Sequence, residues 1–251
     1  VKEPKVEFGG DFICDDPKMG IGVGSFYSQS SNSHKSEINI AVISTEQLVT
    51  DSLKWIKNFE NRIVATETVL KEKYGTVRDG EIDDEDEIDD LIEFEYEENQ
   101  EFIKQEEEKI INKKYNPDFL GFNSETQLNC VFQNNEANNR FVKQRELNKI
   151  LEDTDLKQLE KLDAVIDMIV SQFTDLIENK VSAVDICYII IPTKVFTQLH
   201  SIRYSKTHIN LRRKLKAKLI AIENTIPTQI VMEATIKGTK KSMQDLSMTA
   251  W

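Results

Sequence analysis

The run Ile186-Cys187-Tyr188-Ile189-Ile190-Ile191 predicts a strand buried on both faces, because it is apolar throughout and rich in β-branched residues. A second strand is expected at Thr228–Met232, directly after Pro227. Between them, residues 210–222 predict an amphipathic helix, since its apolar residues recur on one face at Leu211, Leu215, Leu219 and Ile222. Strands that alternate with helices indicate an α/β protein with a Rossmann-like parallel sheet flanked by helices.

An earlier strand-helix unit supports the same fold class. Residues 38–43 predict a buried strand, and the helix after it is expected to run to about Ala65. Ser44 and Gln47 have the spacing of a capping box at the start of this helix. Its predicted inner face consists of Leu48, Ser52, Trp55, Ile56, Phe59 and Ile63.

Further elements are expected between these two units. Residues 128–132 predict a short strand, and residues 139–151 and 156–179 predict helices. Apolar residues at alternating spacings of three and four in the second helix could form a coiled-coil seam or pack on a sheet. Packing on a sheet is favoured, because the apolar strand at 186–191 follows the helix.

The charge of the chain is unevenly distributed. Acids outnumber bases 44 to 32, for a formal charge of −12. Thirteen of the acids lie in residues 79–98, which contain no base, so the formal charge of the rest sums to +1. An acidic total therefore does not exclude a nucleic-acid partner. The acids of this run are contiguous and are not folded back at the defined spacing of a metal-binding loop, which favours a solvated or disordered segment over a metal site. Docking of a basic partner is the alternative.

No acidic residue occurs between Asp185 and Glu223. A local positive field beside the end of a buried strand is suited to a phosphate group. Arg212 and Lys216 are four apart and should share one face of the helix. The alternative is a solvated basic face with no ligand. The bases of this stretch are Lys194, Arg203, Lys206, Arg212, Arg213, Lys214, Lys216 and Lys218.

Other motifs favour a binding protein over an enzyme. The glycines of residues 20–24 lack the GxGxxG spacing and precede the first strand, so we expect a structural turn there. The three histidines suggest no catalytic arrangement, and Cys14, Cys130 and Cys187 have no zinc spacing. Sparse cysteines, no apolar run of membrane length and no signal peptide predict a cytoplasmic protein.

The domain organisation predicted from these patterns has three parts. Residues 1–37 form an irregular N-terminal segment, and residues 38–232 form the α/β domain. Residues 79–114 are an acidic surface insertion in that domain, either disordered or a solvated helix. Residues 233–251 begin a further region.

Several blocks of the sequence, in this order, resemble prokaryotic Argonautes, with a MID domain that runs into the start of PIWI. The blocks are Pro4–Gly10, Asp16–Ile21, Asn116–Phe122, Leu215–Lys218, Ile226–Val231 and Gln244–Trp251. The resemblance covers most of the chain except the acidic insertion. It implies a MID domain that anchors the 5′ phosphate of a guide strand.

In that family, a His or Tyr, a Lys four residues later and a downstream Gln form the phosphate pocket. The matching positions here are Arg212, Lys216 and Gln229. Arg212 keeps a phosphate donor but supplies no aromatic ring for stacking on the first base. The resemblance further implies first-base contacts from Thr193, Lys194 and Thr228, no catalytic residue, no protein-held metal, and Mg²⁺ only as a companion of the guide 5′ phosphate.

The opening block lies close to residue 1, and in this the chain resembles the short Argonautes. Members of that group are usually catalytically inactive and act in defence against plasmids and phage. The implied partners are a guide RNA or DNA, complementary target DNA, a PIWI half, and an effector of nuclease, TIR or Sir2 type, with no membrane. The family's last pocket lysine and the PIWI carboxylates are expected beyond Trp251, in a longer chain or a separate one. A non-enzymatic interaction protein that uses its acidic segment is the alternative function, and a nucleotide-processing enzyme ranks third.

Overall fold

The computed structural model describes residues 4–31, 33–65, 118–204, 207–222 and 226–238. They belong to one compact unit that residues 66–116 interrupt in sequence. The predicted acidic insertion at 79–114 and most of the predicted region at 233–251 lie outside the described residues.

A five-stranded sheet forms the centre of this unit, with strand order β4-β3-β6-β9 and β5 beside β3. The strands are β3 (Glu37–Ser44), β4 (Val131–Asn134), β5 (Arg140–Phe141), β6 (Ile186–Ile191) and β9 (Thr228–Met232). Every pair in the sheet is parallel. The predicted parallel α/β sheet is thus confirmed, and β6 and β9 have the predicted bounds.

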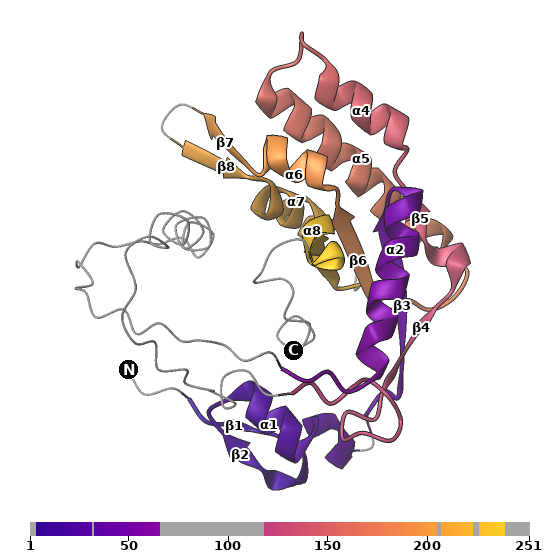
Figure 1. The fold of residues 1–251 in the computed structure, drawn as a ribbon, viewed down its shortest axis with the longest axis vertical. Helices are drawn as coiled ribbons and strands as arrows, with labels where there is room; N and C mark the ends of the chain where they lie inside the picture. Colours follow the sequence, from indigo (N-terminus) through magenta and orange to yellow (C-terminus); the bar gives the residue numbers. More distant parts are fainter. Residues whose placement is uncertain (1–3, 32, 66–117, 205–206, 223–225, 239–251) are drawn as a thin grey trace, which may run out of the picture. The chain divides into compact units, whose positions relative to one another are not determined.

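Helices cover both faces of the sheet (Figure 1). Alternate residues of β3 divide between two cores: Ala41 and Ile43 face one, and Ile40 and Val42 face the other. The first core is covered by α4 (Gln144–Glu152), α5 (Gln158–Asn179), α6 (Thr193–Leu199) and α7 (Leu211–Ile220). The second core is covered by α2 (Glu46–Lys57) and α8 (Glu233–Lys237). This layering is compatible with a Rossmann-like fold.

Helix α5 packs on the sheet, as the sequence favoured over a coiled-coil seam. Its inner face buries Leu162, Ile166, Ile169, Phe173 and Leu176 in the first core, among residues of β3 and β6. The predicted bounds of this helix differ from the observed ones by two residues at the start.

Four predicted boundaries were wrong, two of them because a residue joins the sheet. Ser44 does not cap α2, because its buried hydroxyl ends β3 and donates to the carbonyl of Ile190 (2.8 Å). Helix α2 ends at Lys57, and a 3₁₀ turn at Asn58–Glu60 follows. Helix α4 begins at Gln144, because residues 140–141 pair with β3 as β5. Strand β4 begins at Val131, three residues later than predicted.

The N-terminal segment is more regular than predicted. It contains β1 (Val6–Glu7), β2 (Ile13–Cys14), α1 (Pro17–Gly24) and 3₁₀ turns at Gly9–Asp11 and Tyr27–Ser31. Asp16 caps α1 by accepting a hydrogen bond from the Met19 amide (3.0 Å). Gly20, Gly22 and Gly24 lie in this helix, and Gly20 allows close packing there, since a Cβ on it would lie 2.1 Å from the Phe8 ring. The prediction of a turn at 20–24 was therefore wrong.

Two elements between β6 and α7 were not predicted. Residues 193–194, which were predicted as first-base contacts, begin helix α6, and an antiparallel hairpin follows it. The hairpin strands are β7 (Ser201–Tyr204) and β8 (Thr207–Asn210). Ile202 and Ile209 face each other across the hairpin and pack on the first core.

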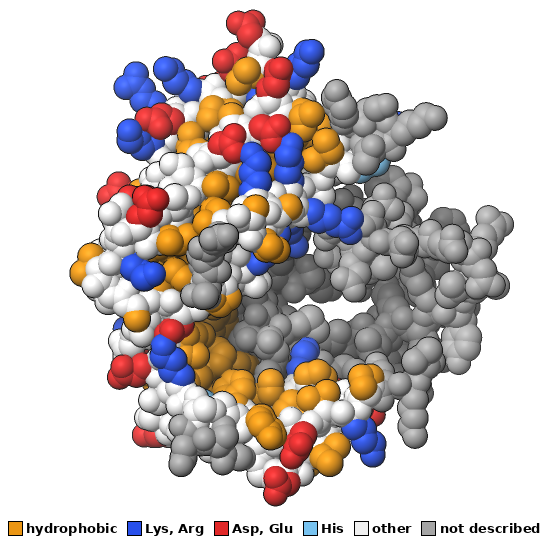
Figure 2. Space-filling view, turned by 180° about the vertical axis from the view of Figure 1, so that it is seen from behind, with side chains coloured by type: hydrophobic (Ala, Val, Ile, Leu, Met, Phe, Trp, Pro, Cys, Tyr) orange, Lys and Arg blue, Asp and Glu red, His pale blue; other side chains and the backbone are white. Residues whose placement is uncertain are grey.

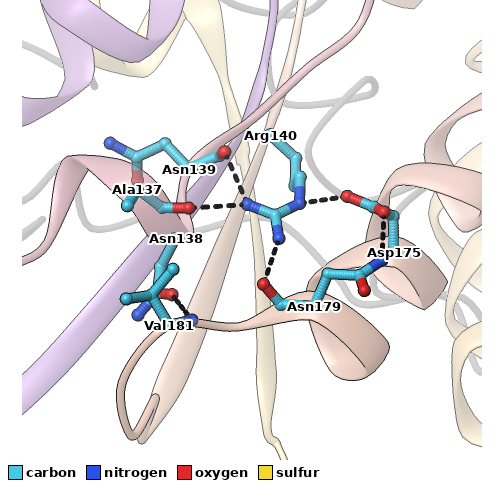
Figure 3. Close-up of polar contacts among 7 residues, drawn as sticks. All are labelled: Ala137, Asn138, Asn139, Arg140, Asp175, Asn179 and Val181. Carbon is cyan, nitrogen blue, oxygen red and sulfur yellow. Dashed lines mark hydrogen bonds and ion pairs between the residues drawn. The ribbon is translucent and has the colours of Figure 1, made fainter.

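A polar network fills the gap between β4 and β5. Arg140 donates to the carbonyl oxygens of Ala137 (2.9 Å) and Asn179 (3.1 Å) and pairs with Asp175 (Figure 3). Its guanidinium also donates to the carbonyl of Asn139 (3.0 Å). The Arg140 side chain is 12 % exposed, so the network fixes the C-terminal end of α5 to the sheet and is not an anion site.

Asp185 ties the start of β6 to β3, and its contribution to stability should depend on pH. Its carboxylate accepts from the Asn39 amide N–H (2.8 Å) and pairs with Lys35. Burial alone would raise the pKa of Asp185, but the hydrogen bonds and charge of Lys35 and the Asn39 bonds hold the pKa below its ordinary value.

A carboxyl with a lowered folded-state pKa stabilises the fold above its unfolded pKa, and this stability is lost as the pH falls through the folded pKa. We expect Asp185→Asn to lower the free energy of unfolding by about 1 kcal/mol at neutral pH and progressively less below about pH 4. Urea unfolding across this pH range measures the difference. Exposed Asp155→Asn is the control, and a pH-independent cost of Asp185→Asn would contradict the expectation.

Candidate phosphate-binding site on helix α7

The position of α7 is set by a cap and one apolar row. The Asn210 side chain accepts a hydrogen bond from the Arg213 amide (3.1 Å), which starts the helix. Leu211, Leu215 and Leu219 are four residues apart and at most 3 % exposed. This buried row fixes where the other rows of the helix point.

One basic row of α7 is neutralised by α5. Lys214 pairs with Asp163, and Lys218 pairs with Asp167, each at 2.5 Å. The two lysines are four residues apart on α7, and the two aspartates are four residues apart on α5. Ion pairs therefore join the two helices at two successive turns. The stretch that lacks acids in sequence therefore has acids beside it in space. These two lysines are not available as a free positive field.

The other basic row consists of Arg212 and Lys216. The Lys216 ammonium donates to the carbonyl oxygen of Thr228 and to its hydroxyl (3.0 Å). Arg212 is exposed and has no hydrogen-bond or ion-pair partner in the part of the chain that the structure describes. Within the same residues, no carboxylate pairs with Lys216. Unlike Lys214 and Lys218, the two bases of this row therefore have no neutralising carboxylate among the described residues.

Gln229 does not share this surface. Successive residues of a strand point to opposite faces, and Thr228 and Ile230 face the helix layer that holds α7. Gln229 pairs in register with Tyr188, which packs on the opposite core. The structure thus brings Lys216 and Thr228 together and directs the Gln229 side chain to the other face of the sheet.

Thr193 and Lys194 lie at the other edge of the sheet from Thr228. Thr228 pairs with Cys187 at the start of β6, whereas Thr193 follows the end of that strand. Four strand residues separate these edges, or about 13 Å. The Lys194 ammonium is held by α4, through Asn148 (3.1 Å) and Glu152 (2.6 Å). The predicted first-base residues therefore do not form one group.

The carboxyl edge of the sheet already contains an anion. The Glu233 carboxylate accepts a hydrogen bond from the Thr193 amide (2.7 Å) and pairs with Lys237. Burial alone would raise the pKa of Glu233, but Lys237 and the Thr193 amide hold the pKa below its ordinary value. The cavity at this edge, between Ser44, Thr45, Pro192 and Val195, is about 10 Å³, room for roughly one water molecule.

Other chemistry has little support among the described residues. Burial raises the pKa of the Cys187 thiol to about 12, so it is no thiolate nucleophile at neutral pH. In the described ranges, no group of three His, Cys, Asp or Glu side chains could hold a metal ion. No helix in those ranges is long and apolar enough to cross a membrane.

Sequence reasoning missed the partners that divide the basic residues into two groups. Asp163 and Asp167 precede α7 by about fifty residues, and only their four-residue spacing on a predicted helix hinted at a match with Lys214 and Lys218. It also missed the hairpin, on which Arg203 and His208 lie opposite each other.

The fold and this surface define a three-layer α/β protein with an available basic row on a helix next to the last strand of its sheet. No protein-family model matches the chain, and no curated protein matches it.

Proposed function

We propose that the chain binds the 5′-phosphorylated end of a guide strand through the Arg212–Lys216 row of α7. One observation carries the proposal: this row has no acidic partner among the described residues, whereas the Lys214–Lys218 row is neutralised by α5. Arginine and lysine four residues apart on one helix face can donate together to a phosphate group.

The first turn of α7 is unusual in a way that supports an anionic ligand. It contains Arg212 and Arg213 and no acidic residue. Cations at a helix N-terminus oppose the helix dipole, at a cost of about 0.3–1 kcal/mol each. Local rules are broken most often where function requires it. A phosphate bound there would interact favourably with both the arginines and the positive end of the helix dipole, and so would offset this cost.

The sequence blocks support a more specific role, that of the MID domain of a short Argonaute. In this proposal, the Rossmann-like layer holds a guide RNA or DNA that selects target DNA. A PIWI half and an effector protein complete the system, and this chain is itself catalytically inactive. The orientation of Gln229 calls for one change to the family pattern: Thr228 is the polar neighbour of Lys216.

Binding of oligonucleotides with a 5′ phosphate or a 5′ hydroxyl tests the proposal. We expect wild type to prefer the phosphorylated end and Lys216→Met to bind it at least about tenfold more weakly, since a charge-assisted hydrogen bond is lost. Lys216→Arg should retain part of the preference. Lys218→Met is the matched control, because Lys218 lies on the same helix but is paired with Asp167. Equal affinity of wild type for both ends would refute the proposal.

A second candidate function is an interaction protein, and exposed apolar side chains of the N-terminal segment favour it. Met19, Val23 and Tyr27 are 45 %, 55 % and 59 % exposed, and they are four residues apart. Figure 2 shows hydrophobic side chains gathered in the lower part of the view, the level of β1, β2 and α1 in Figure 1. In the alternative predicted from the sequence, such a protein also docks a basic partner through its acidic segment. Deletion of residues 79–98 separates this function from guide binding: guide binding should survive the deletion, and docking of the basic partner should not.

A further inference from the structure

We infer that the exposed face of the β7–β8 hairpin binds the sugar-phosphate backbone of a nucleic-acid strand, through Arg203 and His208. This inference rests on the proposed function, because it extends the strand beyond the phosphate held by α7. It concerns a different surface, which the terminal-phosphate site does not need.

The register of the hairpin places its basic side chains together. Arg203 pairs directly with His208, and residues opposite each other in an antiparallel pair have their side chains on the same face. The alternate pair, Ile202 with Ile209, packs on the first core and anchors the other face. The hairpin therefore has one apolar side, which holds it, and one polar side, which faces solvent.

The polar side has donors without acidic partners. Arg203 and His208 are both exposed, and neither forms an ion pair with any residue that the structure describes. Among the described residues, the His208 ring lies within hydrogen-bond distance of the Ser201 hydroxyl (3.4 Å). An arginine donates to phosphate in a bidentate manner, and an imidazole has an N–H donor in either protonation state. Both residues thus suit phosphodiester oxygens.

The hairpin leads directly into the candidate terminal site. Strand β8 ends at Asn210, which is also the N-cap of α7, and Arg212 follows in the first turn. The Leu211 amide donates to the His200 carbonyl (3.0 Å), which closes the base of the hairpin against the helix. Figure 1 shows the hairpin extending away from the ends of α6 and α7.

The dimensions fit a strand longer than one nucleotide. Four residues of β structure span about 13 Å, and phosphates of one strand follow each other at about 3.4 Å along a helix axis. Each hairpin strand is therefore long enough to lie beside several phosphates of a strand that continues from Arg212. Isolated phosphate or a single nucleotide would reach only the α7 end.

A length series with the double variant Arg203→Gln/His208→Gln tests the inference. For long oligonucleotides we expect a loss of about tenfold in affinity and a decrease of about one to two in the slope of log affinity against log salt, because up to two phosphate contacts disappear. A 5′-phosphorylated dinucleotide should bind the variant as it binds wild type. Long strands with a 5′ hydroxyl should lose the same factor as those with a 5′ phosphate.

Arg145→Gln is the matched control, since Arg145 is an exposed arginine of α4 without an ion-pair partner among the described residues. It should leave affinity and salt slope unchanged. The inference is overturned if the hairpin variant matches wild type on long strands, or if it weakens the dinucleotide equally. A missing preference for the 5′ phosphate with an intact hairpin effect would overturn the proposed terminal site but support the backbone track.

Discussion

Asn139→Ala should lower the free energy of unfolding by about 2–4 kcal/mol, because it leaves two buried polar groups without partners. The Asn139 side-chain oxygen accepts from the backbone N–H of Val42 (3.0 Å) and from the Asn134 amide (3.0 Å). Asn139 also donates to the Asn134 side-chain oxygen (3.1 Å). Val42 is 0 % exposed and Asn139 is 5 % exposed, so water cannot replace these bonds without rearrangement.

The large effect follows from the position of Asn139 in the sheet. Strand β4 ends where Asn134 pairs with Ile40, and β5 begins where Arg140 pairs with Ile43. Val42 lies in the gap, so a side-chain amide supplies the acceptor that a neighbouring strand would give. Asn134 likewise donates to the Ile40 carbonyl (3.0 Å). Removing Asn139 therefore breaks the ladder of a central strand.

Urea unfolding followed by circular dichroism measures this cost. Asn61→Ala is the matched control, because Asn61 is exposed and should change stability by less than about 0.5 kcal/mol. If Asn139→Ala costs no more than this control, the amide network does not stabilise the sheet.

The sequence predicted the elements whose signal is local. Strands β6 and β9 are apolar over their whole length, and α5 repeats its apolar residues with helical spacing, so their place and type could be predicted. Strand β5 could not be predicted, because it has two residues and its neighbours bond through amide side chains. Such bonds join residues far apart in sequence and leave no periodic pattern.

The candidate site was predicted in part, for a related reason. The spacing of Arg212 and Lys216 correctly placed them on one face of a helix, because helical periodicity is local. The acids of α5 determine which bases of α7 are neutralised. The alternation of side chains along β9 determines which strand residues face α7. Gln229 and Thr228 are adjacent in sequence but lie on opposite faces, so matching a motif alone could not separate them.

Phe173→Ala should lower the free energy of unfolding by about 3–5 kcal/mol, a large share of the roughly 5–15 kcal/mol that holds a typical domain folded. Phe173 is 0 % exposed and lies in the first core, where α5 packs on the sheet and against helices α4 and α7. Truncation removes apolar contacts and leaves a cavity that the surrounding elements can fill only in part.

The expected loss tests whether α5 organises this half of the molecule. Phe173→Leu should cost less, since it restores most of the side-chain volume, and Ile220→Ala on α7 should cost less than about 0.5 kcal/mol because Ile220 is 78 % exposed. Chemical denaturation of the three variants gives the order directly. Equal costs for Phe173→Ala and Ile220→Ala would contradict the packing described.

Helix α5 also carries Asp163 and Asp167, which neutralise Lys214 and Lys218. If Phe173→Ala loosens α5, these two lysines should lose their partners. Residual phosphate binding by this variant should therefore depend less on the Arg212–Lys216 row.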